Sequence, residues 1–341
     1  MRKCALSVMP DLLRAVAEAT PLYLPVDTDK GDALFTRWFE GADWSGACNT
    51  ARGPKDLFFP QTEDLVAFKT AGKTVEVLDI RREQEDFVVF GVRPCDVKAI
   101  EVLDRVFLSE PVDSFYAARR NHALIVTAAC SRPTETCFCG TFGIDPTALC
   151  GDVTVWKTED HVYWQAATEQ GERFLAALDG FLEDADDTAV TAQRAQTAAL
   201  LSRLPLHSLR ADAFGGGKTE AFFDHPAWDT LSQSCLGCGT CTFVCPTCQC
   251  YDIKDFDTGH GVVRYRCWDS CMYSDFTKMA NGNPRLTQKE RFRQRFMHKL
   301  VYYPENNDGL FSCVGCGRCL AKCPISMNIA TVMNTLGGDA R

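Results

Sequence analysis

Two copies of one cysteine pattern lie in the last third of this 341-residue chain and constrain its fold more than any other feature. Each copy reads C-x2-C-x2-C-x3-C-P, once in segment 235–246 and again in segment 313–324. Three thiolates at consecutive spacings of three come from one tight loop and can hold three corners of a 4Fe-4S cubane. Where two such runs occur together, the fourth Cys of each run ligates the other cluster. The spacing therefore predicts two clusters with crossed ligation.

The predicted ligands form two sets of four, Cys235, Cys238, Cys241 and Cys323 for the first cluster, and Cys313, Cys316, Cys319 and Cys245 for the second. Glycines at 237, 239, 315 and 317 let the backbone wrap closely around the sulfurs. A cubane held entirely by Cys has no open iron position for a substrate, so one-electron transfer is the expected activity. A pair of zinc sites is the alternative, but zinc modules usually separate two C-x2-C pairs by a longer loop.

The bulk composition narrows the class of protein further. Nineteen cysteines indicate metal rather than disulfides, because disulfide-dense proteins are typically small secreted domains and this chain is long. A net charge of -9 argues against nucleic acid as a partner. No apolar run reaches the roughly 18 residues of a membrane span, and the N-terminal segment does not resemble a signal peptide. We expect a cytoplasmic protein.

The cysteine content divides the chain into two predicted domains. Residues 1–214 read as an α/β or α+β domain, and residues 215–341 as a mostly helical, bacterial-ferredoxin-like domain with two 4Fe-4S clusters. Buried strands are predicted at 87–92 and 123–127, with a helix from Pro94 to Phe107 between them. Alternating segments 153–156 and 161–164 predict a hairpin, and residues 171–204 are predicted to be helical.

Eleven of the 19 cysteines lie outside the two runs. A possible extra metal site is formed by Cys248, Cys250, Cys267 and Cys271 near the first run, or by Cys95, Cys137 and Cys139 upstream, where these residues follow predicted strands. Buried packing is the alternative for all of them, because free Cys often serves as a small apolar residue. Cys130 belongs to the weaker upstream set, and Cys4, Cys48 and Cys150 are isolated in sequence and are interpreted as structural. A third iron–sulfur cluster is therefore possible.

No acid–base or nucleophilic catalytic residue is predicted, and no nucleotide-binding fingerprint is found. Gly217-Lys218-Thr219 resembles the end of a phosphate-binding loop, but Asp212 replaces the required glycine. Segment 288–299 is basic and is predicted to be a helix anchored by Phe292 and Phe296. Its positive side chains could stabilise a reduced, more negative cluster.

Seven segments resemble one family of 4Fe-4S dicluster proteins, the iron–sulfur electron-transfer subunits of anaerobic sulfite reductases and the beta subunits of cytoplasmic nickel-iron sulfhydrogenases. They are GVRPCD at 91–96, CFC at 137–139, DHPAWD at 224–229, CPTCQCY at 245–251, WDSCM at 268–272, RFRQRFMHK at 291–299 and CVGCGRC at 313–319. The resemblance implies a non-catalytic relay in a complex of at least three subunits. One partner would carry FAD and a 2Fe-2S centre and oxidise NAD(P)H, and the other would be a catalytic subunit of the nickel-iron hydrogenase or sulfite reductase type.

Two other functions stay open. The chain could be a self-contained iron–sulfur oxidoreductase with a flavin or substrate site in its N-terminal domain. It could also be a redox-sensing module, which predicts a DNA-binding helix pair or a basic surface that the sequence does not contain. The resemblance favours the electron-transfer subunit of an anaerobic oxidoreductase complex.

Overall fold

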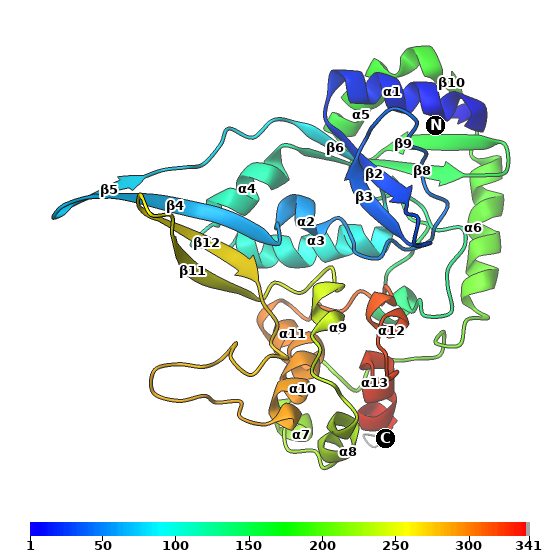
Figure 1. The fold of residues 1–341 in the computed structure, drawn as a ribbon. Coiled ribbons are helices and arrows are strands. Elements are labelled where there is room, and N and C mark those ends of the chain that lie inside the picture. The colour runs from blue at the N-terminus through cyan, green and yellow to red at the C-terminus, as the bar shows by residue number, and fades with distance from the viewer. Residues whose placement is uncertain (339–341) are drawn as a thin grey trace.

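An eight-stranded mixed sheet is the framework of the first half of the chain in the computed structural model, which describes residues 1–338 (Figure 1). Its strand order is β10-β1-β9-β8-β7-β6-β2-β3. The central neighbours are parallel: β2 (Leu22–Asp27), β6 (Phe87–Val92), β7 (Ala123–Ala128) and β8 (Val153–Lys157). The outer strands run antiparallel: β1 (Arg2–Ala5), β3 (Ala33–Arg37), β9 (His161–Ala166) and β10 (Glu183–Asp184). The strands predicted at 87–92 and 123–127 and the predicted hairpin are confirmed.

Helices cover both faces of this sheet because its central strands are apolar on both sides. Val88 and Phe90 pack under α1 (Met9–Ala19) and α5 (Glu169–Ala177). Phe87 and Val89 point to the opposite face, as successive residues of a strand must, and pack under α3 (Pro94–Phe107) and α4 (Ser114–Asn121). The mixed α/β fold is thus confirmed, as is the predicted helix from Pro94 to Phe107.

Helix α6 (Thr188–Leu201) lies across the carboxyl ends of β7 and β8. Thr197 Oγ1 donates to the carbonyl of Cys130 at 3.1 Å, and Gln193 donates to the carbonyl of Lys157. The segment predicted as helical at 171–204 is therefore two helices, α5 and α6, separated by the acidic segment that contains β10. Short helical turns complete this half: η1 (Leu6–Val8), α2 (Lys55–Phe58), η2 (Cys139–Phe142) and η3 (Asp179–Phe181).

The second half is built from short helices around a core of its own, which includes Phe292 and Phe296. They are α7 (Thr219–Phe222), α8 (Ala227–Gln233), α9 (Thr240–Phe243), α10 (Gln288–Met297), η4 (His298–Tyr302), α11 (Tyr303–Asn306), α12 (Arg318–Ala321) and α13 (Ile329–Gly338). A capping box between Thr287 and Glu290 begins α10, and its two phenylalanines are 2% and 1% exposed, so the predicted anchoring is confirmed. No helix within residues 1–338 is long and apolar enough to cross a membrane.

A second sheet joins the two halves, and the sequence did not predict it. The hairpin β4 (Thr62–Ala71) and β5 (Thr74–Leu78) pairs with the hairpin β11 (Tyr251–Asp257) and β12 (Val262–Trp268) through β4 and β12. In Figure 1 these strands project from the side of the molecule. The expectation of a mostly helical second domain is not confirmed, because this part also contributes a long hairpin. The division at residues 214 and 215 stays a prediction.

A buried charge network fixes the junction between the two hairpins. Arg266 of β12 is 3% exposed, and its guanidinium lies 2.6 Å from Glu63 of β4 and also pairs with Asp113. Arg119 pairs with the other oxygen of Glu63. Because charges cannot be left unpaired away from water, this network specifies which strands meet.

We predict that Arg266→Ala lowers the free energy of unfolding by about 3–5 kcal/mol, because it leaves Glu63 and Asp113 without their shared partner. The matched control is Arg264→Ala on the same strand, whose pair with Asp255 at 2.7 Å is about half exposed (45% and 48%). That variant should lose less than about 1 kcal/mol. Anaerobic urea unfolding followed by tryptophan fluorescence measures both, and equal losses would contradict the prediction.

Candidate iron–sulfur site

The first cavity in the second half is lined by cysteines from both runs. Cys235 and Cys238 come from the loop that leads into α9, Cys241 lies in α9 itself, and Cys323 comes from the loop after α12. Met272, Phe292 and Phe296 form its apolar wall. Hydrogen bonds with Thr240 lower the pKa of Cys238, and Gln288 Nε2 donates to the sulfur of Cys235 at 3.4 Å.

The second cavity has the complementary set. Cys313, Cys316 and Cys319 line it together with Cys245 of the first run. The structure thus groups the eight cysteines as crossed ligation requires, while their binding of iron stays a prediction. Within residues 1–338, no three Cys, His, Asp or Glu side chains converge as the ligands of a single ion would. A cubane needs a different arrangement, since its four thiolates each bind a separate iron around a central space.

Glycines hold the second run against the α/β part of the molecule. Gly315 and Gly317 have φ angles of 60° and 77°, and a Cβ atom on either would lie 2.4 Å from a carbonyl oxygen, of Phe138 and of Thr136 respectively. The carbonyl of Gly315 also accepts a hydrogen bond of 2.9 Å from the amide of Phe138. The predicted close wrapping therefore includes contact with an upstream segment that itself carries cysteines.

Three buried cations lie beside these cavities, and none forms an ion pair with a carboxylate in the described part of the chain: Lys55, Arg295 and Lys299. Arg295 lines both cavities, and its Nε is buried without a hydrogen-bond partner. Lys299 Nζ donates to Thr247 Oγ1 at 2.8 Å and to the carbonyl of Ser312 at 3.2 Å. A buried charge without a counterion is costly, so the residues fit an anionic occupant such as a thiolate-bound cluster.

Burial and the neighbouring thiols have opposite effects on the pKa values of the two lysines. Burial by itself would lower the pKa of Lys299, but the neighbouring thiolates of Cys245, Cys248 and Cys313 raise it above its usual value. Lys55 has the opposite balance, since burial dominates and lowers its pKa. Of the two lysines, Lys299 therefore has the stronger preference for the protonated, positively charged form.

A buried ion pair ties the second cavity to α3. Arg318, between Cys316 and Cys319, forms bonds of 2.6 and 2.7 Å with the two carboxylate oxygens of Asp96. The side chains are 2% and 1% exposed, and Arg318 also donates to the carbonyl of Thr50 at 2.9 Å. The ligand loop is thereby held by the α/β part of the chain.

The upstream cysteines gather in a third cavity, directly beside the second. Cys95, Cys137 and Cys139, predicted as a possible set, line it together with two others, Cys48 and Cys130. The interpretation of Cys48 as structural rests on its isolation in sequence, but its sulfur lies 3.9 Å from that of Cys130. These two residues, 82 positions apart, meet only through the tertiary fold, so no local spacing could have found them.

Of the four cysteines that follow the first run, three lie near Cys245 and one lies in the projecting sheet. A hydrogen bond from the Cys248 thiol lowers the pKa of Cys245, and Cys271 makes the same kind of bond to Cys250. Cys267 faces Asp252 and Thr62 across the projecting sheet and lines none of these cavities. The structure brings the first three together and leaves Cys267 apart.

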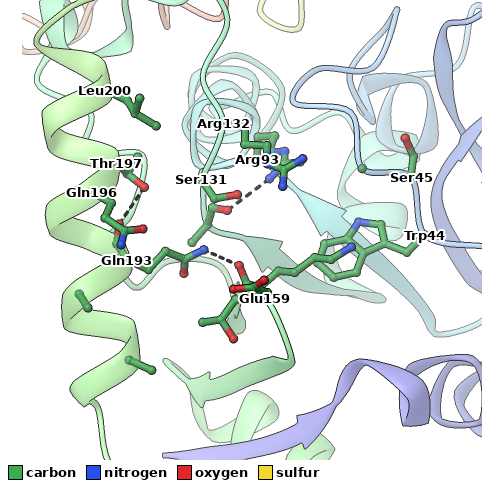
Figure 2. A pocket seen from close by; sticks show the side chains of 16 residues that line it. Trp44, Ser45, Arg93, Ser131, Arg132, Glu159, Gln193, Gln196, Thr197 and Leu200 are labelled. Atoms are coloured by element: carbon green, nitrogen blue, oxygen red, sulfur yellow. Dashed lines mark hydrogen bonds between the residues drawn. The ribbon is translucent and has the colours of Figure 1, made fainter.

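A larger pocket opens where β6, β7 and β8 end, and the sequence did not identify its residues. Figure 2 shows Gln193, Gln196 and Thr197 on α6 at one side, with Trp44 at the opposite side. The charged residues that line it are Arg93, Arg132, Lys157 and Glu159. Crevices at the carboxyl ends of parallel strands commonly bind ligands, and this one has an excess of positive charge.

Comparison with known proteins agrees with the motifs. Residues 234–327 match the family described as a 4Fe-4S dicluster domain. Sulfhydrogenase 2 subunit beta of Pyrococcus furiosus is 32% identical over 287 residues, which cover 82% of this chain and 82% of that protein. No solved structure matches. The resemblance inferred from the motifs is confirmed.

We predict that Asp96→Ala lowers the free energy of unfolding by about 3–5 kcal/mol, because Arg318 would stay buried without its carboxylate. The control is Asp32→Ala, which breaks a pair with Lys322 at 2.8 Å whose side chains are 45% and 38% exposed. It should cost less than about 1 kcal/mol. Guanidinium unfolding under anaerobic conditions compares them, and a loss in Asp96→Ala no larger than in Asp32→Ala would refute the prediction.

Proposed function

This chain belongs to the sulfhydrogenase beta-subunit family and is an iron–sulfur electron-transfer subunit, and we propose that it relays electrons through two 4Fe-4S clusters between two partner subunits. The first cluster would be held by Cys235, Cys238, Cys241 and Cys323, and the second by Cys313, Cys316, Cys319 and Cys245. The observation that carries this proposal is the crossed grouping of the two runs around separate cavities.

Such clusters supply one-electron transfer when bound, and the protein residues set where and how readily it occurs. Four Cys ligands leave no iron position open to a substrate, which favours a relay over a catalytic centre. Arg295 lines both cavities, so one cation serves both sites and balances the negative charge of their thiolates. Cys238 is exposed, which supports entry or exit of electrons at the first site.

The partners follow from the family. One would be an NAD(P)H-oxidising subunit with FAD and a 2Fe-2S centre, and the other a catalytic subunit of the nickel-iron hydrogenase or sulfite reductase type. The name of the Pyrococcus furiosus relative, a sulfhydrogenase subunit, favours the hydrogenase type. The net charge of -9 agrees with a protein partner rather than nucleic acid.

A second function is favoured by the pocket of Figure 2, where Arg93, Arg132 and Lys157 could receive an anionic flavin or substrate. The chain would then be a self-contained oxidoreductase. We rank this function below the relay because the sequence contains no nucleotide-binding fingerprint. Adding NAD(P)H to the anaerobic isolated chain separates the two, because a relay is reduced by dithionite but not by NAD(P)H unaided.

We predict that Cys238→Ala lowers the iron and acid-labile sulfide content by about four atoms each and removes one set of EPR signals from the reduced chain. The matched control is Cys267→Ala, since Cys267 lines neither cavity and its loss should leave both contents unchanged. Zinc without sulfide in the wild-type chain would overturn the relay, as would an unchanged iron content in Cys238→Ala.

We also predict that Lys299→Met makes the reduction potential of the second cluster more negative. A buried positive charge favours the reduced, more negative state, and losing about 1.4 kcal/mol of that stabilisation corresponds to roughly 60 mV for one electron. The control is Lys289→Met on α10, because Lys289 is 41% exposed and pairs with Asp229. Redox titration followed by EPR measures both, and equal shifts would contradict a specific role for Lys299.

A further inference from the structure

We propose that the α/β part of the chain binds a third 4Fe-4S cluster in the cavity beside the second site, with Cys48, Cys130, Cys137 and Cys139 as ligands. None of these residues belongs to the two ferredoxin-like runs. A third cluster would extend the relay. It rests on the proposed function in one respect: the neighbouring second site must hold a cluster.

The four cysteines line one cavity although three separate segments supply them. The sulfurs of Cys48 and Cys130 are 3.9 Å apart, and Cys137 lines the same cavity. Cys139 follows two residues later, is 6% exposed, and lines the cavity as well. Cys95 lines this cavity too and packs against the small apolar cluster that contains Cys316, so it lies between this cavity and the second one.

The size of this cavity matches those of the two predicted cluster sites. Its volume is about 20 Å³, against about 30 Å³ for the first site and about 20 Å³ for the second. Since the same type of occupant is proposed for those two, the similar size of this cavity supports the same occupant here.

Several polar groups are directed at the sulfur of Cys137. The amide of Thr134 donates to it at 3.4 Å, the Thr134 hydroxyl lies at 3.2 Å, and Asn49 Nδ2 donates at 3.9 Å. N–H and O–H groups directed at a ligand sulfur are typical of iron–sulfur sites, where they help to set the potential. The same kind of contact is made by Gln288 at Cys235 of the first site.

Arg93 supplies positive charge at the wall of the cavity. Its guanidinium donates only to backbone carbonyls, including those of Ala47 at 2.7 Å and Cys48 at 2.8 Å, and pairs with no carboxylate among residues 1–338. It therefore repeats the arrangement of Arg295 and Lys299, a cation beside thiols without a counterion. An anionic cluster would provide the missing negative charge.

The position of this cavity makes it a continuation of the relay. Cys316, a predicted ligand of the second cluster, lines both cavities. An electron given up at the second site would be taken up at the third, so that one site is oxidised and the other reduced by one electron. Arg93 lines this cavity and also the open pocket of Figure 2, which gives the relay a second exit at the carboxyl ends of the strands.

Metal and sulfide analysis of the anaerobically purified chain tests the proposal. The wild-type chain should hold about twelve irons and Cys137→Ala about eight, since each cluster has four. The control is Cys150→Ala, a cysteine of the same part of the chain that lines no such cavity, which should keep about twelve. Cys48→Ala should repeat the loss, and circular dichroism checks that each variant is folded.

Three results would overturn the third cluster. One is about eight irons in the wild-type chain, half of them lost in Cys238→Ala, which leaves the two-cluster relay intact. Another is a zinc ion that is lost in Cys137→Ala while the iron content stays constant. The last is an iron loss in Cys271→Ala but none in Cys137→Ala or Cys48→Ala, which would assign the extra iron to the cysteines that follow the first run.

Discussion

Charge balance around buried thiols is the constraint on which the rest of this structure depends. Lys55, Arg295 and Lys299 are each 4% exposed or less and have no carboxylate partner in the described residues. Several kcal/mol would be needed to bury such a charge uncompensated, so the positions of Arg295 and Lys299, which line the cavities, are reasonable only beside an anionic occupant. The cysteine loops therefore depend on the cations that face them. Helix α10 carries Arg295, and η4, which continues it, carries Lys299.

The same constraint explains why the two halves of the chain are joined so closely at the second cavity. Asp96 of α3 neutralises Arg318 within the ligand loop, and the Phe138 amide pairs with the Gly315 carbonyl of that loop. Arg266 and Glu63 join the halves again in the projecting sheet. Rigid contacts of this kind hold redox sites at a fixed separation, which suits a protein that transfers electrons rather than one that must open and close.

The α/β part is thus more than a platform for the clusters. Two cavities lie near the ends of its parallel strands: the upstream cysteine cavity and the pocket of Figure 2. Arg93 lines both of them. A sheet concentrates functional groups at the carboxyl ends of its strands because the loops there converge from several strands. The proposed third cluster would extend the relay to this edge.

From the sequence alone, the local features could be predicted: the two C-x2-C-x2-C-x3-C-P runs, the strands at 87–92 and 123–127, and the helix that carries Phe292 and Phe296. Each depends on spacings of a few residues or on apolar periodicity. Only the tertiary structure brought Cys48 to Cys130, and Arg266 to Glu63 across 203 positions. It alone placed β5, whose Val75 and Val77 are mostly exposed and give no burial pattern, in the projecting sheet. Long-range contacts of this kind follow from how whole elements pack, which no local spacing encodes.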